Sequence, residues 1–410
     1  MSTPAKLPPF RVIEAALRVT TERLTREIAT PRPSAPDWND FEWAVARATS
    51  SMHGISGLLA TRLAWRGPPA WLRFLETQHE FIRQQHEEVG RVLARADRSF
   101  RASGIAFVAL KGSALRALEI YRPGERPQAD IDLLVEPDQL RACEGPLREI
   151  GYHRTLSTAR HDVYTPTSAG APTDVGEHPD NPLKIEVHSR ISEALPLTET
   201  DITSTLLPAT RRPGANPYAN LAALMRHTGL HAAGNMRANA MRFMQIVEVA
   251  WLARRMTSRD WQELLEGTSR HAPWWLFPAL ALAARYVPGS VPEPVLTEAG
   301  RTCPRRLRQR YSAVGVYDVS WSNPRIAALP GHEWSRTPAE TWRYLQSRAL
   351  PSRERRDQLV AGARSVNPHL LRIPWYGRSH AERILRWIFS RPPRVQTLSV
   401  VSAALREAGP

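Results

Sequence analysis

The sequence predicts an α+β protein in which a small mixed β-sheet lies between two helical regions. Short apolar runs bounded by Gly, Pro and polar residues gather between residues 105 and 200, as strands do. On both sides of this segment, apolar residues recur at the spacing of amphipathic helices. We therefore expect a helical region over 1–104, a sheet domain over 105–200 and a helical, arginine-rich domain over 201–410.

Amphipathic helices are expected through most of the first 104 residues. In the last of them, Leu75, Ile82 and Val89 fall on one stripe while charged residues occupy the rest of the surface. Proline-rich linkers separate the helical stretches. The predicted helices span residues 12–28, 40–63 and 71–100, with Asp37 or Asp40 as the cap of the second.

The middle segment alternates predicted strands with predicted helices. An apolar run over 104–110 stops at Lys111-Gly112-Ser113, and a helical stretch follows. The later elements are separated by loops rich in Gly and Pro. They are a helix over 114–121, a strand over 130–135, a helix over 137–150, a hairpin or loop over 153–182 and a strand over 183–188.

Helical spacing returns after residue 201. The clearest stretches are 219–230, 238–255 and 260–265, and a looser tail rich in Arg, Trp and Pro follows them. Since helices of this kind bury one apolar face, we expect them to pack into a further helical domain.

Composition excludes several classes of protein. Of the 410 residues, 42% are hydrophobic and 23% charged, which is ordinary for a globular chain and argues against general disorder. The two cysteines lie far apart, which excludes a disulfide scaffold, and no Cys/His cluster has zinc-finger spacing. The N-terminus lacks the pattern of a signal peptide, and we expect no membrane span. A cytoplasmic location is therefore expected.

Positive charge is concentrated at the C-terminal end. The net charge is +15, and residues 301–410 hold 20 arginines against 7 acidic residues. A basic surface of this kind favours polyanions such as tRNA, although a chain with only three lysines also has the arginine bias of composition drift. The tail's tryptophans could stack on bases, but the core of a helical domain is the favoured place for them: Trp321, Trp334, Trp342, Trp375 and Trp387.

Three acidic residues of the middle segment are spaced for metal chemistry. Asp130 and Asp132 are two residues apart on a predicted strand, so both carboxylates project from the same face. Glu186 alternates with Ile185 and Val187 on a later strand. Mg²⁺ prefers such oxygen ligands together with substrate phosphates, although solvated acids on an outer sheet face are the common reading of Asp-x-Asp alone.

The Lys111-Gly112-Ser113 turn lies where a strand passes into a helix. Backbone N–H groups at such a turn can bind phosphate, and Gly112 lets a ligand approach the backbone closely. The Ser113 hydroxyl could bond a phosphate oxygen or cap the helix. The glycine spacing of a P-loop is absent, so a helix-capping turn is the simpler reading of the turn taken alone.

Together, these motifs resemble the DNA polymerase beta-like nucleotidyltransferase superfamily, and within it an uncharacterised bacterial nucleotidyltransferase family. The order is strand, Gly-Ser, helix, Asp-x-Asp and then a lone carboxylate. The family features are Leu-Lys-Gly, an Arg before Asp-Ile-Asp-Leu-Leu-Val, Ile-Glu-Val-His, and a helical segment with His, then Arg, then an acid. They correspond here to Leu110–Gly112, Arg126, residues 130–135, residues 185–188 and, in the helical segment, residues 224–231, Arg242 and Glu248. The resemblance leads us to expect an Asp at position 248, where this chain has Glu.

The resemblance implies roles for the core residues. Asp130 and Asp132 would bind two Mg²⁺ ions, with Mn²⁺ as the alternative, and Glu186 would complete the ion that activates the attacking group. Gly112 and Ser113 would hold the β- and γ-phosphates. Arg126 would neutralise triphosphate charge, and Lys111 is a phosphate contact or an ordinary strand-end lysine.

Four further residues are candidates on the acceptor side or behind the ligands. His188 is either a partner of Glu186 or a packed histidine at the end of a strand. His227 and His231 share one helix face and could be zinc ligands, but acceptor-side or structural roles are favoured. Arg242 belongs to the same helical segment of the resemblance.

The implied reaction is attack of an acceptor hydroxyl, or an amine, on the α-phosphate of an NTP, with release of pyrophosphate. The acceptor is open between a small molecule, a protein and tRNA, because a fold does not define a substrate. The alternative is a non-catalytic RNA-binding protein on the same scaffold. Intact carboxylates and the intact Gly-Ser pair favour the enzyme.

Overall fold

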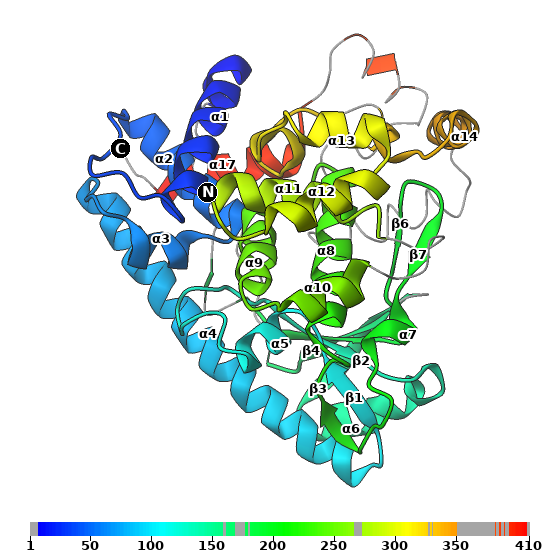
Figure 1. The fold of residues 1–410 in the computed structure, drawn as a ribbon. Helices are drawn as coiled ribbons and strands as arrows, with labels where there is room; N and C mark the ends of the chain where they lie inside the picture. Colours follow the sequence, from blue (N-terminus) through cyan, green and yellow to red (C-terminus); the bar gives the residue numbers. More distant parts are fainter. Residues whose placement is uncertain are drawn as a thin grey trace.

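The computed structural model has the α+β architecture expected from the sequence, with a mixed sheet below a large body of helices (Figure 1). It describes residues 7–158, 161–168, 177–178, 181–265, 273–326, 329, 331–350, 382, 385–386, 389 and 393–407. Within these ranges, none of the helices combines the length and the apolar character that crossing a membrane requires.

The N-terminal helices follow the sequence prediction with one break. Gly54 has a left-handed backbone (φ 66°) and caps the second helix, so the stretch expected as one helix over 40–63 is two. The cap expected at Asp37 or Asp40 is Asn39, whose side chain accepts from the Glu42 N–H in a capping box. The helices are α1 (Phe10–Glu27), α2 (Asp40–His53), α3 (Ser56–Arg62) and α4 (Pro69–Ala102).

Among the described residues, the main sheet has six strands in the order β3-β4-β5-β2-β1-β8. The pairs β2–β5 and β1–β8 are parallel, whereas β1–β2, β4–β5 and β3–β4 are antiparallel. The strand expected over 183–188 therefore lies in the centre, next to the strand of Asp130 and Asp132. The bounds are β1 (Ala106–Ala109), β2 (Asp130–Leu134), β3 (Tyr152–Ser157), β4 (His161–Pro166), β5 (Lys184–His188) and β8 (Gly214–Asn216).

The two faces of this sheet bury different partners. Ile131, Leu133 and Val187 form a core with Phe100 and other residues of the long helix α4, which runs along one edge of the molecule in Figure 1. On the opposite face, Leu134 belongs to the core of the C-terminal helices. Because strand side chains alternate, Asp132 and Glu186 point to this second face, away from α4.

Short elements connect the strands. The stretch expected as a helix over 137–150 contains two 3-10 turns, Pro137–Gln139 and Arg141–Cys143, before α6 (Glu144–Glu149). Pro146 lies in the first turn of α6, the part of a helix where its missing N–H costs nothing. The remaining elements of this region are α5 (Gly112–Ala117), β6 (Ser192–Ala194) paired with β7 (Glu199–Asp201), and α7 (Thr203–Leu206).

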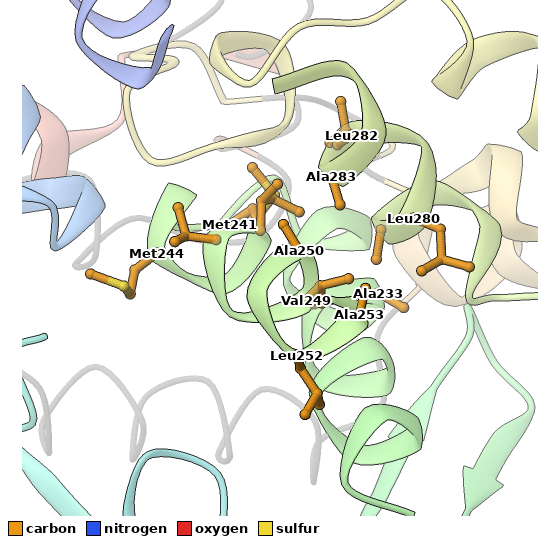
Figure 2. Packing of buried hydrophobic residues seen from close by; sticks show 14 of the residues in the cluster. Ala233, Met241, Met244, Val249, Ala250, Leu252, Ala253, Leu280, Leu282 and Ala283 are labelled. Carbon is orange, nitrogen blue, oxygen red and sulfur yellow. The ribbon is translucent and has the colours of Figure 1, made fainter. Parts of the chain in front are cut away.

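The C-terminal helices pack around one apolar centre. Figure 2 shows Ala233 of α8 (Leu221–Arg237), Val249 and Ala250 of α9 (Phe243–Ala253) and Ala283 of α11 (Phe277–Tyr286) meeting there. The helix expected from 238 begins at Phe243, because Asn239 has a left-handed backbone (φ 50°). The other helices that the structure describes here are α10 (Ser258–Leu265), α12 (Glu293–Thr302), α13 (Arg305–Tyr311), α14 (Pro338–Ala349) and α17 (Val395–Glu407), with 3-10 turns at Tyr317–Val319 and His332–Trp334.

The two ends of the chain pack together. In Figure 1, α17 lies beside α1 and α2, and apolar residues of α17 share a core with those of α1 and α2. Residues of α3 and α4 likewise share the large core of the C-terminal helices. The division of the chain into three domains remains a proposal. In this structure, residues of its N-terminal and C-terminal helical parts share apolar cores.

Candidate active site

Strand register brings the predicted carboxylates together. On the parallel pair β2–β5, Asp132 is the direct partner of Glu186, and Leu134 is the partner of His188. Asp130 lies two residues before Asp132, at the exposed start of β2. The three carboxylates therefore occupy neighbouring positions on the sheet face that looks away from α4.

Asp132 is the most enclosed member of the group, with 7% of its side chain exposed. Its Oδ2 accepts from the Lys111 ammonium at 2.9 Å, and its Oδ1 lies 2.9 Å from His188 Nε2. Burial alone would raise the pKa of Asp132, but the Lys111 charge and the His188 hydrogen bond hold it well below its usual range. Asp132 is therefore a carboxylate, and His188 Nε2–H donates to it.

Glu186 has the opposite electrostatic environment. Burial and the neighbouring Asp132 and Asp130 charges raise the pKa of Glu186 to about 7. Its Oε2 lies 3.7 Å from His188 Nε2 and 3.8 Å from His161 Nε2. Desolvation by surrounding protein atoms and the Asp132 charge also raise the pKa of Asp130, even though its side chain reaches solvent. This site needs a cation or protons to relieve its carboxylate repulsion.

A divalent metal fits these side chains. One ligand atom each from Asp132, Glu186 and His188 lies within 4.8 Å of the others, and among the described residues this is the one group of its kind. Three carboxylates against the single Lys111 ammonium leave a local charge of −2 when all are ionised. Oxygen donors with this charge suit a divalent cation that also binds substrate phosphates.

The Lys111-Gly112-Ser113 turn lies at the end of β1, on the side of Asp132. Lys111 has a left-handed backbone (φ 42°), and its N–H donates to the Tyr218 hydroxyl at 3.0 Å. The Ser113 hydroxyl, expected to bond phosphate or cap the helix, accepts from Gln128 Nε2 at 3.0 Å, and the N-cap residue of α5 is Lys111. The turn is therefore held in place from both sides by side chains distant in sequence.

Arg126 lies over Gly112. A Cβ added at Gly112 would fall 2.7 Å from Arg126 Cζ, so this close approach requires glycine. The guanidinium Nε donates to Glu248 Oε1 at 2.7 Å, and both side chains are largely buried. Burial lowers the pKa of Arg126, but the Glu248 charge and hydrogen bond, together with Tyr121 and Asp130, outweigh burial and raise it. Glu248 of α9 thus fixes Arg126 beside the turn.

The helical histidines are placed behind the turn. His227 is buried, and its Nδ1 lies 2.7 Å from the Tyr218 hydroxyl that binds the Lys111 N–H. Burial and the Lys111 charge hold the pKa of His227 far below its usual range. Desolvation lowers the pKa of His231 to about 3, and its Nε2 contacts Asn235. The structure thus ties His227 to the turn.

Arg242 is exposed at the N-terminal end of α9. Its positive charge lowers the pKa of Asp130, against the larger effects of burial and Asp132. It also acts on Glu177, whose carboxylate accepts from Gln85 of α4 at 3.0 Å. Arg242 therefore lies on the same side of the molecule as the carboxylates.

Several residues of this site carry no sequence signal of their own. Glu177 falls in a polar stretch expected as a loop, and Gln85 lies on a helix whose polar face has many similar residues. His161 begins β4 in the same stretch, and only the β4–β5 register places it beside His188. Tyr218 could be found only from its contact with His227.

Several arginines of the basic tail, residues 301–410, make contacts within the protein. Arg310 pairs with Glu333, Arg325 with Glu14, and Arg394 lies over the Trp321 ring with its Cζ 5.0 Å from the centroid. Trp334 is fully buried, as favoured from the sequence, whereas 63% of Trp342 is exposed. Trp375 and Trp387 lie outside the described residues.

A mixed sheet with carboxylates on adjacent strands, next to a Lys-Gly-Ser turn, is the core expected of a nucleotidyltransferase. The chain belongs to the family described as uncharacterised nucleotidyltransferase, whose model matches residues 39–288, more than half of the chain. The matched range includes the sheet, the turn and α9. Comparison with curated proteins and with solved structures finds no match.

Proposed function

We propose that this protein transfers a nucleoside monophosphate from an NTP to an acceptor hydroxyl or amine, with a divalent metal, Mg²⁺ or Mn²⁺. The observation that carries the proposal is the direct pairing of Asp132 with Glu186 on β2 and β5, beside the Lys111 turn, in a member of a nucleotidyltransferase family. The same proposal includes a cytoplasmic location without a membrane span, and an NTP as the substrate.

The carboxylates would hold the metal and the reacting groups. Asp130 and Asp132 would hold two ions, and Glu186 would complete the second. Bound metal supplies charge stabilisation at the α-phosphate and lowers the pKa of the attacking group. As a ligand of the second ion, Glu186 would be ionised and would assist removal of the proton from the acceptor hydroxyl.

The turn and Arg126 would bind the triphosphate. The backbone of Gly112 and Ser113 would hold the β- and γ-phosphates, and Arg126 would stabilise the charge that develops as pyrophosphate leaves. In the transfer, the acceptor oxygen forms a bond to the α-phosphorus, and the bond from that phosphorus to the bridging oxygen breaks. Lys111 would keep Asp132 ionised and aligned rather than act as a free phosphate ligand, because its ammonium already bonds Asp132.

Nucleotide binding tests the proposal without knowledge of the acceptor. ATP should bind the wild-type chain in the presence of Mg²⁺ and fail to bind, or bind far more weakly, in the Asp130→Ala/Asp132→Ala variant. His153→Gln, an exposed change on β3, is the matched control and should bind as wild type. If neither the wild type nor the variants bind ATP, GTP, CTP or UTP while the chain binds RNA, the non-catalytic RNA-binding scaffold is favoured instead.

A further inference from the structure

We propose that His188 and His161 join Asp132 and Glu186 in a mixed nitrogen and oxygen site that selects a first-row transition metal ion, such as Mn²⁺, over Mg²⁺. This inference deepens the proposed function, on which it rests, by identifying the ion beside Glu186. The sequence analysis treated His188 as a partner of Glu186 or as a packed residue, and it made no use of His161.

Two neighbouring positions in the sheet register create the site. His161 on β4 is the direct partner of His188 on β5, and their rings lie 4.9 Å apart between centroids. Glu186, two residues before His188, is the direct partner of Asp132 on β2. Since side chains two residues apart share a face, two imidazoles and two carboxylates meet above three adjacent strands.

The separations suit common coordination to one ion. Metal–ligand bonds of about 2.0–2.2 Å place adjacent ligand atoms about 2.8–3.6 Å apart, the lower values in octahedral and the higher in tetrahedral geometry. His188 Nε2 lies 2.9 Å from Asp132 Oδ1 and 3.7 Å from Glu186 Oε2, and His161 Nε2 lies 3.8 Å from the same Glu186 oxygen. The ligand atoms of Asp132, Glu186 and His188 all lie within 4.8 Å of one another, and the His161 ring would have to turn toward this group to join the same ion.

The free protein already aligns the key ligands. Lys111 occupies Asp132 Oδ2, so Oδ1 is the oxygen directed at His188. A metal ion between Oδ1 and Nε2 would replace the proton that now joins them. The side chains of His188 and His161 are 12% and 24% exposed, so the imidazoles are enclosed but accessible to an ion.

Ligand chemistry then determines the ion. Mg²⁺ binds oxygen and keeps much of its water, and imidazole adds little to its binding. Imidazole nitrogen binds first-row transition metals well, and carboxylates suit Mn²⁺. A site with two nitrogens and two carboxylate oxygens should therefore retain Mn²⁺ in the presence of excess Mg²⁺, whereas Asp130 and the substrate phosphates would suit Mg²⁺.

Electron paramagnetic resonance of Mn²⁺ added to the full chain without nucleotide tests this site. We expect bound Mn²⁺ with nitrogen coupling in its echo modulation, retained under a large excess of Mg²⁺. His188→Gln should remove the coupling of one nitrogen and weaken Mn²⁺ binding by about 10- to 100-fold. His161→Gln should remove the other nitrogen, and His153→Gln on β3 should change neither.

Absence of nitrogen coupling in the wild-type chain would overturn the inference, as would unchanged coupling in the His161→Gln/His188→Gln double variant. The wild-type spectrum decides the matter even where a variant fails to fold. Failure of this site and failure of the proposed function are distinguishable, because nucleotide binding supported by Mg²⁺ is measured separately. Normal ATP binding without nitrogen coupling would remove the transition metal and keep the nucleotidyltransferase.

Discussion

The buried ion pair of Arg126 and Glu248 gives a quantitative prediction about how the sheet domain is joined to α9. Arg126 follows the turn region in sequence, Glu248 lies on α9, and their Nε–Oε1 distance is 2.7 Å. Their side chains are 18% and 7% exposed. Removing either partner leaves the other charge in a poorly hydrated place.

The expected cost follows from this burial. Breaking a buried pair by removing one partner costs about 3–5 kcal/mol, and the residual exposure of Arg126 places Glu248→Leu near the lower figure, about 3 kcal/mol. Arg126→Met should cost about the same, because it leaves Glu248 unpaired. The double variant has no unpaired charge and should cost no more than either single variant, which gives a coupling energy of about 3 kcal/mol.

Urea unfolding of the wild type, Glu248→Leu, Arg126→Met and the double variant measures this coupling energy. If the unfolding free-energy costs of the two single variants sum to the cost of the double variant within about 0.5 kcal/mol, the reasoning is refuted, because independent sites behave in that way. The exposed pair Arg91–Glu88, with side chains 67% and 43% exposed, is the control, and its cycle should give no more than about 0.5 kcal/mol. ATP binding should be weakened by Arg126→Met, with or without the change at Glu248.

Three further outcomes are expected. The pKa of Glu186 is about 7 in the folded chain against 4.5, so the folded state binds more protons between these values, and the free energy of unfolding in metal-free buffer should fall by up to about 3 kcal/mol as pH rises across them. Glu186→Gln should lose most of this slope, and an unchanged slope would contradict the assignment. Gly112→Ala should weaken ATP binding and cost about 1–3 kcal/mol in urea unfolding by displacing Arg126, whereas Gly145→Ala, with open space around it, should be nearly neutral; equal effects would show that the close approach is unimportant. If the acceptor is tRNA, bulk tRNA should bind through residues 301–410 with an affinity that falls steeply between about 50 and 200 mM salt, and lack of binding at the lower salt would remove nucleic acid as an acceptor.

The sequence was sufficient for the fold class because the central strands are short apolar runs with clear limits. Alternation around Asp132 and Glu186 also predicted that each carboxylate faces away from its apolar neighbours, and the structure places both on one sheet face. The boundaries predicted least well were those set by single backbone conformations. Gly54 and Asn239 end or delay helices through left-handed backbones, which apolar spacing does not reveal.

The partners of the site residues could not be read from the sequence. Pairing of β4 with β5 depends on tertiary register, so the position of His161 beside His188 has no local signal. Glu248 matched the acid of the resemblance, but its contact with Arg126 joins residues 122 positions apart. Such contacts arise from packing of the helical body on the sheet, and hydrophobic periodicity carries no information about them.

Label transfer from α-³²P-labelled NTPs, with Mg²⁺ or Mn²⁺ and cell extract, tests the central claim most directly. The account predicts label on an acceptor from the α-position, none from the γ-position, and a loss of at least about a hundredfold in Asp132→Asn, whose fold is checked by circular dichroism. Treating the product with ribonuclease and protease identifies the acceptor as RNA, protein or a small molecule. Transfer by Asp132→Asn at the wild-type rate, or no α-label transfer from any of the four NTPs, would contradict the account.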